Sequence, residues 1–588
     1  MRGAYRVRRW LAPAALGLGT ILAAGCQDRL PTRVGESSEI PLRITASVVG
    51  TPIATLVVTV TAVDISGPLV FNLSVENGVA AGTIKVPPGP ARYIWVTAMD
   101  AEGNVTHEGG VSVDVRPGQN PVVNLKLTPR SGHVPIIVTL GSYGVEVTPT
   151  TASIAVGAKV QLAATVRDVD GHVIDYASVE GATSQPSVAT VSYGLVIGQA
   201  TGTATIVATY EGVAALSDVT VTPIRFGSLS PGEYHTCGLT LAGLAYCWGA
   251  APAIGDGTQY AYRFTPTQVV GGRTFASLSA GGSHTCGVTP GGLAYCWGWN
   301  GGFQLGDGTQ TDRPTPTAVG GGLTFASVTA GLTHTCALTK TGAAYCWGSN
   351  YTGQLGDGTS TTRSSPVPAG GGLTFASLSA GAYHTCGLVA GEAYCWGAND
   401  HGQLGGGTAG NQTVTTPVKV AGGLSFTSLS AGGDATCGLT AGGVAYCWGG
   451  NFYGAVGDGS TTYRASPVPV GGGLTFANLS VSDFSHACGV TLGGVAYCWG
   501  LNTDGQLGDG TTANELSPVV VREQPAFASV RPGGFHTCGL TGDGAAYCWG
   551  ANYTAQLGDG TYTARLTPVA VTSPSGYPAL PSPPARNR

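Results

Sequence analysis

The four-residue sequence Tyr-Cys-Trp-Gly occurs seven times in the C-terminal part of this chain, at intervals of 49 to 52 residues. A second Cys precedes each copy, and a Gly-rich turn such as residues 354–359 (Gln-Leu-Gly-Asp-Gly-Thr) follows it. Short alternating runs separated by turns predict four antiparallel strands in each unit. Such a unit cannot bury both faces of its sheet alone, whereas sheets stacked around an axis can. The sequence therefore predicts a seven-bladed β-propeller over residues 226–572.

The amino-acid composition favours strands over helices throughout the chain. Of 588 residues 95 are Gly, five are Lys and 10% are charged. Gly is a poor helix former, and the abundant Thr, Val and Tyr favour strands. The fold class is therefore expected to be all-β. Residues 226–572 hold 10 Lys and Arg against 16 Asp and Glu without a basic cluster, which argues against nucleic-acid binding.

The repeated unit resembles a known family. It reads Phe-Ala-Ser-Leu, Gly-x-x-His-Thr-Cys, Ala-Tyr-Cys-Trp-Gly, Gln-Leu-Gly-Asp-Gly-Thr, Pro-x-x-Val, and is similar to the repeat of the regulator of chromosome condensation family, whose members form seven-bladed propellers. The resemblance also implies two activities known among its members, guanine-nucleotide exchange and enzyme inhibition. The first unit departs from the pattern, because its segment from Ala250 to Ile254 is two residues shorter and lacks an Asn found in the other six. We expect its loop to be reduced.

The first 26 residues have the pattern of an export signal. Several Arg residues precede an apolar run from Trp10 to Ala24, too short to span a bilayer comfortably. The run ends at Cys26 in a sequence that resembles the bacterial lipobox, in which the Cys becomes the lipidated first residue. The alternative is an ordinary cleaved signal with an incidental Cys26. We expect a protein of the cell envelope or its extracellular face, attached to membrane only through this lipid, on the outer membrane if the cell is Gram-negative.

Three further segments surround the propeller. After a linker at residues 27–39, residues 40–130 alternate in the manner of a β-sandwich. Residues 145–223 resemble the bacterial immunoglobulin-like domains of surface proteins, although the Cys and Trp of antibody domains are missing. The tail at residues 573–588 is rich in Pro and Ser and is expected to be disordered.

Fourteen of the 15 Cys form seven pairs, one in each unit, and Cys26 is the fifteenth. Export to an oxidising compartment and the facing positions in a hairpin favour disulfides. Zinc ligation with the neighbouring His is one alternative, but the fifth unit keeps both Cys while Ala435 replaces the His. Buried free thiols are the other alternative. The expected disulfides are Cys237–Cys247, Cys286–Cys296, Cys336–Cys346, Cys386–Cys395, Cys437–Cys447, Cys488–Cys498 and Cys538–Cys548.

The side chains that vary between units are the candidates for function, because a uniform scaffold holds its specificity in loops. A His that recurs in six units is interpreted as structural, and no catalytic, metal-binding or cofactor-binding residue is identified. Aromatic residues in the loops after Trp-Gly are typical interface anchors, or else cover the blade ends. This predicted binding rim consists of Trp299, Tyr351, Phe452, Tyr453 and Tyr553.

These features predict a monomeric, non-enzymatic binding or adhesion protein that recognises a protein or glycan at the cell surface, with enzyme inhibition as a variant. The main alternative is an exported hydrolase or lyase with its site at the propeller axis. Titratable side chains converging there would favour the enzyme, and dispersed aromatic loops on one rim would favour binding. Exchange-factor activity is a second alternative that rests on the family resemblance alone.

Replacing Cys26 with Ser should abolish lipidation and release the protein from the membrane, because the thiol is the attachment point. Mass spectrometry of the mature N-terminus and detergent-phase partitioning measure the change. Unchanged membrane association of this variant would rule out the lipobox interpretation.

Overall fold

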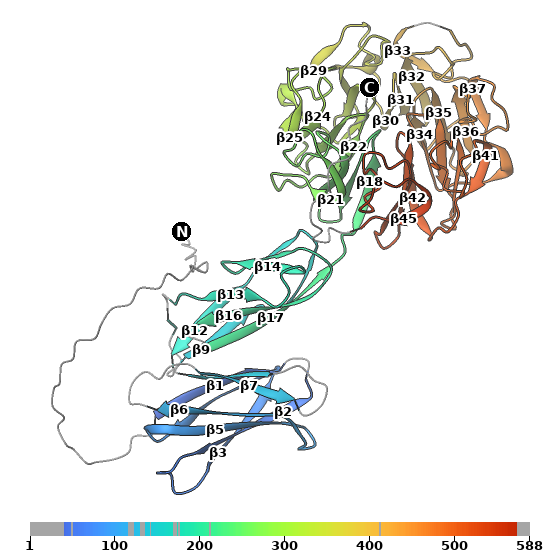
Figure 1. Ribbon diagram of the computed structural model, residues 1–588. Helices are drawn as coiled ribbons and strands as arrows, with labels where there is room; N and C mark the ends of the chain where they lie inside the picture. Colours follow the sequence, from blue (N-terminus) through green and yellow to red (C-terminus); the bar gives the residue numbers. More distant parts are fainter. Residues whose placement is uncertain are drawn as a thin grey trace, which may run out of the picture. The chain divides into compact units, whose positions relative to one another are not determined.

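The computed structural model describes residues 40–48, 51–115, 123–129, 136–141, 143–168, 173–174, 177–210, 213–410 and 413–572. These residues are strands and connecting turns, with three single 3-10 turns, η1 (Gly320–Gly322), η2 (Gly370–Gly372) and η3 (Gly471–Gly473), which confirms the all-β prediction. They divide into two compact units, one ending at Pro223 and one beginning at Ile224 (Figure 1). The expected signal peptide with Cys26, the linker 27–39 and the tail 573–588 lie outside the described residues. Within the described ranges, no helix is long and apolar enough to cross a membrane.

The first eight strands form a closed barrel in the order β1-β4-β3-β2-β5-β6-β7-β8. Inward-facing side chains such as Leu56, Val58, Ile84 and Ile94 are fully buried in its core. This differs from the β-sandwich expected over residues 40–130, because β8 lies beyond that boundary and pairs with β1 to close the sheet. Alternating strands of a sandwich and of a barrel have the same sequence pattern. The strands are β1 (Ile40–Ser47), β2 (Ile53–Thr61), β3 (Leu69–Glu76), β4 (Val79–Val86), β5 (Gly89–Asp100), β6 (Val105–Val115), β7 (Val123–Pro129) and β8 (Ile136–Gly141).

The next nine strands form three small sheets, ordered β10-β17-β16-β13, β11-β15-β14 and β12-β9. Strands β10 and β17 pair in parallel, and the other pairs are antiparallel. The strands are β9 (Tyr143–Thr148), β10 (Thr151–Ala155), β11 (Lys159–Gln161), β12 (Ala163–Asp168), β13 (Glu180–Thr183), β14 (Ala189–Ser192), β15 (Leu195–Gly198), β16 (Gly202–Tyr210) and β17 (Val213–Thr222).

The second unit consists of seven four-stranded antiparallel sheets, each built from consecutive strands. Sheet 1 has β18 (Phe226–Pro231), β19 (His235–Thr240), β20 (Ala245–Ala250) and β21 (Tyr262–Gln268); sheet 2 has β22 (Ser277–Ala280), β23 (His284–Val288), β24 (Ala294–Gly298) and β25 (Arg313–Ala318). Sheet 3 has β26 (Ser327–Ala330), β27 (His334–Leu338), β28 (Ala344–Gly348) and β29 (Arg363–Pro368); sheet 4 has β30 (Ser377–Ala380), β31 (His384–Val389), β32 (Glu392–Gly397) and β33 (Val414–Lys419). Sheet 5 has β34 (Ser428–Ala431), β35 (Ala435–Leu439), β36 (Ala445–Gly449) and β37 (Arg464–Pro469). Sheet 6 has β38 (Asn478–Val481), β39 (His486–Val490), β40 (Ala496–Gly500) and β41 (Glu515–Val520); sheet 7 has β42 (Phe527–Pro532), β43 (His536–Thr541), β44 (Ala546–Gly550) and β45 (Arg565–Ala570).

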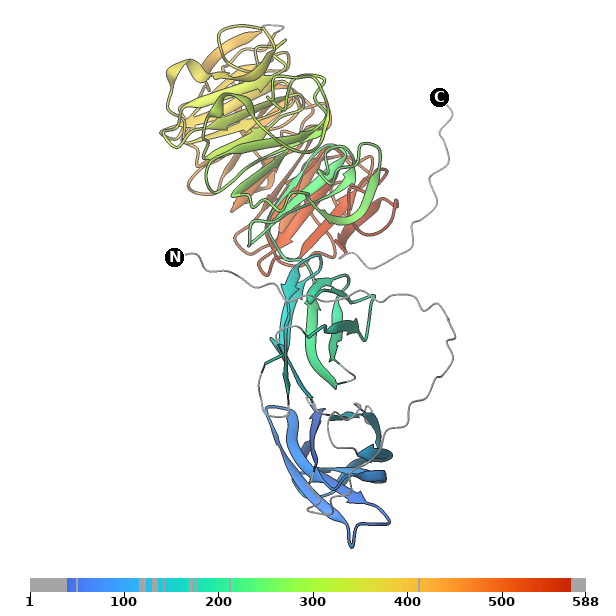
Figure 2. The same ribbon diagram turned by 90° about the vertical axis from the view of Figure 1, so that its left-hand side faces the viewer.

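The seven sheets close into a propeller-like ring. The first strand of each sheet contacts the first strands of both neighbouring sheets, so these strands surround the axis, and the fourth strands lie outside (Figure 1). Sheets 1 and 7 lie side by side in both views (Figures 1 and 2), where the Phe226 amide donates a hydrogen bond to the Gly544 carbonyl. The ring therefore joins the two ends of a long sequence without an exposed edge between them.

Each interface between neighbouring sheets has one buried carbonyl that accepts the indole N–H of a Trp, and at six of the seven it also accepts a Thr hydroxyl. At the interface of sheets 2 and 3, the Gln304 carbonyl accepts the indole N–H of Trp347 at 2.9 Å and the hydroxyl of Thr335 at 2.8 Å. The Trp donates at all seven interfaces, over 2.9 to 3.0 Å. Gly306 lies flat against this indole, and a Cβ there would stand 2.7 Å from its ring. The recurring Trp, Thr and Gly are therefore one packing unit.

The recurring His side chains complete these interfaces, as the structural interpretation expects. Because Thr335 gives its proton to a carbonyl, its oxygen accepts the Nε2–H of His284, and the same pairing occurs in six interfaces at 2.7 to 3.0 Å. All six imidazoles are fully enclosed, and burial lowers the pKa of each to about 3 or about 4. They are neutral at physiological pH.

The interface between sheets 5 and 6 lacks both members of this pair. Ala435 stands in place of the His and Ala487 in place of the Thr. Val481 replaces the Ala found at 280, 330, 380 and 431, and its Cγ1 lies 2.7 Å from where a Cβ on Gly432 would be, a place next to the imidazole at other interfaces. An apolar contact therefore substitutes for the hydrogen bond, and no orphaned hydroxyl remains.

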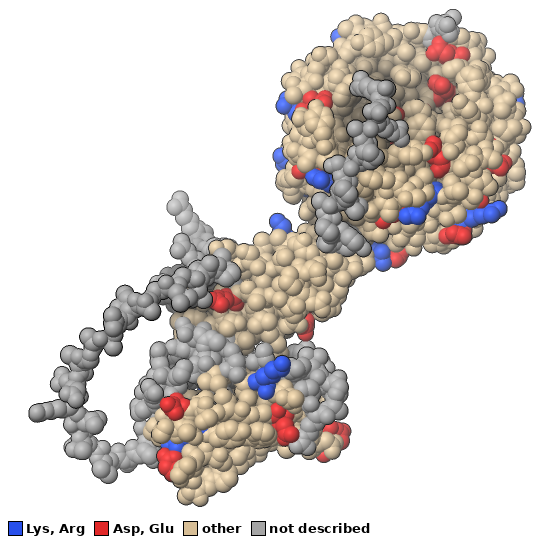
Figure 3. All heavy atoms as spheres, viewed as in Figure 1, with Lys and Arg blue, Asp and Glu red and all other residues tan. Residues whose placement is uncertain are grey.

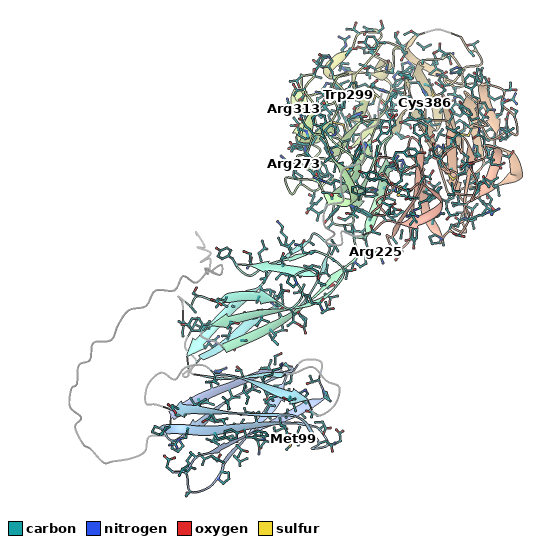
Figure 4. The ribbon with its side chains drawn as sticks, in the orientation of Figure 1. Met99, Arg225, Arg273, Trp299, Arg313 and Cys386 are labelled. Atoms are coloured by element: carbon teal, nitrogen blue, oxygen red, sulfur yellow. A yellow bond between two sulfur atoms is a disulfide. The ribbon has the colours of Figure 1, made fainter. Side chains whose placement is uncertain are left out.

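All seven expected disulfides are present, each between residues that face each other on the second and third strands of a sheet (Cys386 is labelled in Figure 4). Cys237, for example, is the register partner of Cys247. The Asp of the Gly-rich turn is also structural: Asp357 accepts the Thr359 amide and pairs with Arg363. Sheet 4 has Gly406 in place of this Asp and Val414 in place of the Arg.

Restoring the polar pair at the interface of sheets 5 and 6 tests this account. Ala435→His alone should lower the free energy of unfolding by about 1–3 kcal/mol, because the new imidazole has no hydroxyl partner and meets Val481. Ala435→His with Val481→Ala and Ala487→Thr should recover most of that loss. Denaturant unfolding of both variants measures the difference, and equal stability would contradict the pairing.

Stability should fall as the pH drops from about 6.5 to about 4. The six His have pKa values near 6.5 when unfolded and about 3 or 4 when folded, so the unfolded chain binds more protons in this window. Two carboxyls with raised pKa values, Glu233 and Asp483, act with the opposite sign but are fewer. Unfolding midpoints measured at pH 7 and pH 4.5 report the slope. The double variant His334→Ala/Thr385→Val should show a shallower one.

Candidate functional site

One face of the ring carries two sets of loops. The axial turns join the first and second strands, and the rim loops follow each Trp-Gly. The two sets are hydrogen-bonded to each other: the Trp299 amide donates to the Ser283 carbonyl at 2.9 Å, and the Ala551 amide to the Phe535 carbonyl at 2.9 Å. Because every sheet has the same topology, all of these loops lie on a single face.

The predicted rim aromatics lie in these loops and are accessible to solvent. Tyr351 is 78% exposed and Trp299 is 40% exposed, with the other three between them. Phe452 packs edge-on against Tyr463, and the Tyr553 hydroxyl donates to Asp504. Trp299 lines a pocket with residues of sheets 1 and 3, and the other four aromatics are exposed in different loops of the same face.

The pocket has a volume of about 400 Å³ and lies beside the shortened loop of sheet 1. Residues 250–253 of that loop form one wall, and Trp299, labelled in Figure 4, forms another. Glu233 and Tyr234 of the first axial turn, together with Leu332 of the third, line the side nearest the axis. The reduced loop expected from the sequence therefore leaves a space beside the axis.

Glu233 is the charged group of this pocket and is only 8% exposed. Burial raises the pKa of its carboxyl, while a hydrogen bond from the Tyr234 hydroxyl favours the charged form. The same burial and the neighbouring carboxyl raise the pKa of Tyr234 to about 12, so this phenol stays protonated. Gly282 lies next to the carboxylate, where an added Cβ would be 3.4 Å from Glu233 Oε2.

A second carboxyl, Asp483, occupies the corresponding axial turn of sheet 6. This turn, residues 482–485, is one residue longer than the others, and Ser485 adopts φ 68° within it. Burial, and then the negative charge of Glu233, raise the pKa of Asp483 to about 7. The charge of Glu233 in sheet 1 therefore acts on Asp483 in sheet 6.

A basic residue, Arg531, lies on the first strand of sheet 7, three residues before the position equivalent to Glu233. The other six sheets have a Ser or Thr at the position of Arg531. In five sheets a Ser or Thr hydroxyl at this position accepts the amide N–H of the next sheet, as Ser230 does from Ala280. Arg531 precedes sheet 1 in the ring, where Pro231 has no N–H to offer. Residue 531 therefore has no amide N–H to accept from the next sheet. Arg531 remains accessible to solvent, although surrounding protein lowers its pKa.

Sequence reasoning did not identify Glu233, Asp483 or Arg531 as a group. Aligning the first strands of the seven units, with one extra residue before His486, would have shown two acids at a position otherwise held by Gly, Ala or Leu. Their convergence needs the closed ring, because 250 residues separate the two acids in sequence. No cluster of three metal-ligating side chains occurs in the part of the chain that the structure describes.

Comparison with known proteins identifies the repeats. Two profiles of the regulator of chromosome condensation (RCC1) repeat match the chain, one at residues 275–304, 325–354, 375–403, 426–455, 478–506 and 529–556, the other at 291–338, 341–388, 390–439, 493–540 and 543–580.

Two curated relatives share part of this region. The ultraviolet-B receptor UVR8 of Arabidopsis thaliana is 34% identical over 119 residues, which are 20% of this chain and 26% of the receptor. The E3 ubiquitin-protein ligase HERC2 of Homo sapiens is 33% identical over 106 residues, 18% of this chain and 2% of the ligase. The matched segment thus spans about a quarter of the receptor and far less of the ligase.

The crystal structure of human WBSCR16 has a similar fold, with a TM-score of 0.51 at 19% identity, and the match covers 56% of this chain and 94% of that one. With the profile matches and the ring geometry, residues 275–580 of this chain consist of RCC1 repeats, and the unit that they build has a propeller-like fold.

Proposed function

We propose that this chain is a non-enzymatic, lipid-anchored binding protein of the cell envelope, whose seven-bladed propeller recognises a protein partner through the face that carries the axial turns and rim loops. Cys26 would attach it to the membrane, and the two N-terminal β domains would hold the propeller away from the surface. One relative of the repeats, UVR8, is a receptor, which is compatible with recognition as the role of the repeats.

The proposal rests on the difference between the residues that recur in every repeat and the residues that vary. The residues that recur, such as Trp347, Thr335 and Cys336, are buried and used by the scaffold. The residues that vary include a set of exposed aromatics on the face of the axial turns and rim loops, such as Tyr351 and Tyr553. Exposed aromatics spread over a broad surface fit a protein interface better than a single deep pocket. On the side of the ring that Figure 3 shows, charged side chains are few and scattered.

A second function is favoured by one observation. Glu233 and Asp483 are two carboxyls with raised pKa values near the axis, where the enzyme alternative places its site. Paired carboxyls serve as acid and base in glycoside cleavage. An exported hydrolase or lyase acting on glycans would lose activity in Asp483→Asn while keeping its fold. Turnover of envelope polysaccharides by the purified chain, absent in that variant, would replace the binding proposal.

Truncating rim aromatics should weaken partner binding without unfolding the ring. Trp299→Ala and Tyr453→Ala should each cost about 1–3 kcal/mol of binding free energy if they are anchors, with little change in the thermal midpoint. Quantitative capture of envelope proteins on the immobilised full chain, followed by affinity measurement with the recovered partner, supplies the readout.

Two further variants serve as controls. Leu492→Ala removes an 88% exposed side chain from a turn between second and third strands, which lies on the opposite face, and should leave binding unchanged. Trp448→Ala deletes a fully buried indole and should destabilise the ring by about 3–5 kcal/mol. If the rim variants unfold as readily as Trp448→Ala, the rim aromatics are packing residues and the proposed interface is wrong.

A further inference from the structure

The pocket beside the short loop of sheet 1 contains a charge that the protein does not neutralise. Glu233 is almost fully buried and receives a hydrogen bond from the neutral Tyr234. Among the described residues, neither Glu233 nor Asp483 forms an ion pair with a Lys, Arg or His. Buried carboxylates normally have such a partner, because desolvation of an unpaired charge is costly.

The scaffold does not require an acid at these positions. The equivalent residues in the other axial turns are Gly282, Leu332, Ala382, Gly433 and Gly534, and those sheets have the same strand order. The glycines on both sides of Glu233 leave room for its side chain, since an added Cβ on Gly534 would stand 3.0 Å from Glu233 Cα. The acid, its small neighbours and the shortened loop thus occur together at one place.

We propose that this pocket binds the ammonium or guanidinium group of a Lys or Arg side chain that a protein partner inserts beside the propeller axis. Glu233 accepts hydrogen bonds from the cation and Asp483 adds negative potential. Trp299 and Tyr234 provide aromatic walls for the alkyl stem. The inference rests on the proposed protein-binding function and names the chemistry of the anchor residue.

Three properties of the pocket favour a cation over a neutral ligand. A carboxylate combined with Trp and Tyr side chains offers both charge pairing and cation–π attraction. The charge of Glu233 helps to raise the pKa of Asp483 to about 7, and a positive charge bound at Glu233 relieves that repulsion. The volume of about 400 Å³ lies at the lower end of ligand-site sizes and suits one long side chain.

Other charged groups near the axial face are few. Arg531 lies on the first strand of sheet 7. It is not among the groups that shift the pKa of Glu233 or of Asp483. Asp434 of the fifth axial turn contacts His401 at 3.4 Å. Arg531 would limit how deeply a cation enters, so the charged end of the ligand is held at the mouth, near Glu233.

The test uses the full chain carrying Cys26→Ser, prepared without lipid, and two small probes. The first is Nα-acetyl-lysine N-methylamide, and the second is the norleucine analogue, which has a similar alkyl chain and no charge. Saturation-transfer NMR and calorimetric titration should show saturable binding of the lysine probe at pH 8 and at least tenfold weaker binding of the norleucine probe. Affinity for the lysine probe should be lower at pH 6, because protonation of Asp483 removes negative charge.

Glu233→Gln should weaken binding of the lysine probe at least tenfold, and Asp483→Asn should weaken it less and flatten the pH dependence. Glu392→Gln is the matched control: it removes one negative charge from an exposed ion pair with Lys419 and should change nothing. Thermal unfolding shows whether each variant is folded, and Asp483→Asn keeps the test valid if Glu233→Gln is not.

Equal affinity for the two probes, or an unchanged affinity in Glu233→Gln, would overturn the inference. The proposed function can be separated from it. If Tyr453→Ala, which lies outside the pocket, weakens partner binding while the lysine probe never binds, the rim interface stands and the cation pocket fails. If the probe binds but Tyr453→Ala has no effect on the partner, the pocket stands and the rim interface fails.

Discussion

Seven buried carbonyls, one at each junction between neighbouring sheets, hold the propeller-like ring together. Each accepts the indole N–H of a fully buried Trp, and six also accept a Thr hydroxyl. Burying an indole places a polar N–H among apolar atoms, so the carbonyl must lie within hydrogen-bonding distance. The loop that supplies it is therefore fixed, together with the Gly that lies against the ring and the His that donates to the Thr.

One deviation from the repeat involves both members of a hydrogen-bonded pair. Where the His is missing at Ala435, its Thr partner is missing at Ala487 and Val481 occupies space at the interface. Two prolines, Pro231 and Pro532, have no N–H to donate; Arg531 replaces the hydroxyl that would face Pro231, whereas Ser480 is kept opposite Pro532. A single change would leave a buried polar group unpaired, at a cost of about 1–3 kcal/mol. A position whose hydrogen-bonding partner in the neighbouring sheet is absent can hold a residue of another type.

The axial turns show that positions which the scaffold does not need can hold charged residues. Glu233 and Asp483 lie in turns that the fold tolerates with Gly, and the shortened loop of sheet 1 opens a space beside them. Burial of two acids there raises their pKa values, so they lower the stability of the folded state as the pH rises above the ordinary carboxyl range. The proposed binding of a cation would offset this cost, whereas the disulfides and the six neutral His contribute to the scaffold.

The all-β class, the repeat, the favoured disulfide pairing and the shortened first loop could be predicted from the sequence. These follow from local periodicity and from residues close together in the chain, such as Cys237 and Cys247. It also placed the rim aromatics in one set of equivalent loops. Closure of the first domain into a barrel was beyond it, because β8 and β1 meet only in three dimensions and alternation is the same in barrels and sandwiches.

The axial site depends on the tertiary structure and could not be predicted from the sequence. Glu233 and Asp483 are 250 residues apart, and only ring closure through Phe226 and Gly544 brings their turns around one axis. Burial then changes their chemistry, since a pKa depends on surrounding atoms and charges, such as the charge of Glu233 that acts on Asp483. The same holds for the His–Thr pairs, whose members lie in neighbouring sheets about 50 residues apart. Periodicity indicates which residues repeat, whereas packing determines which of them meet.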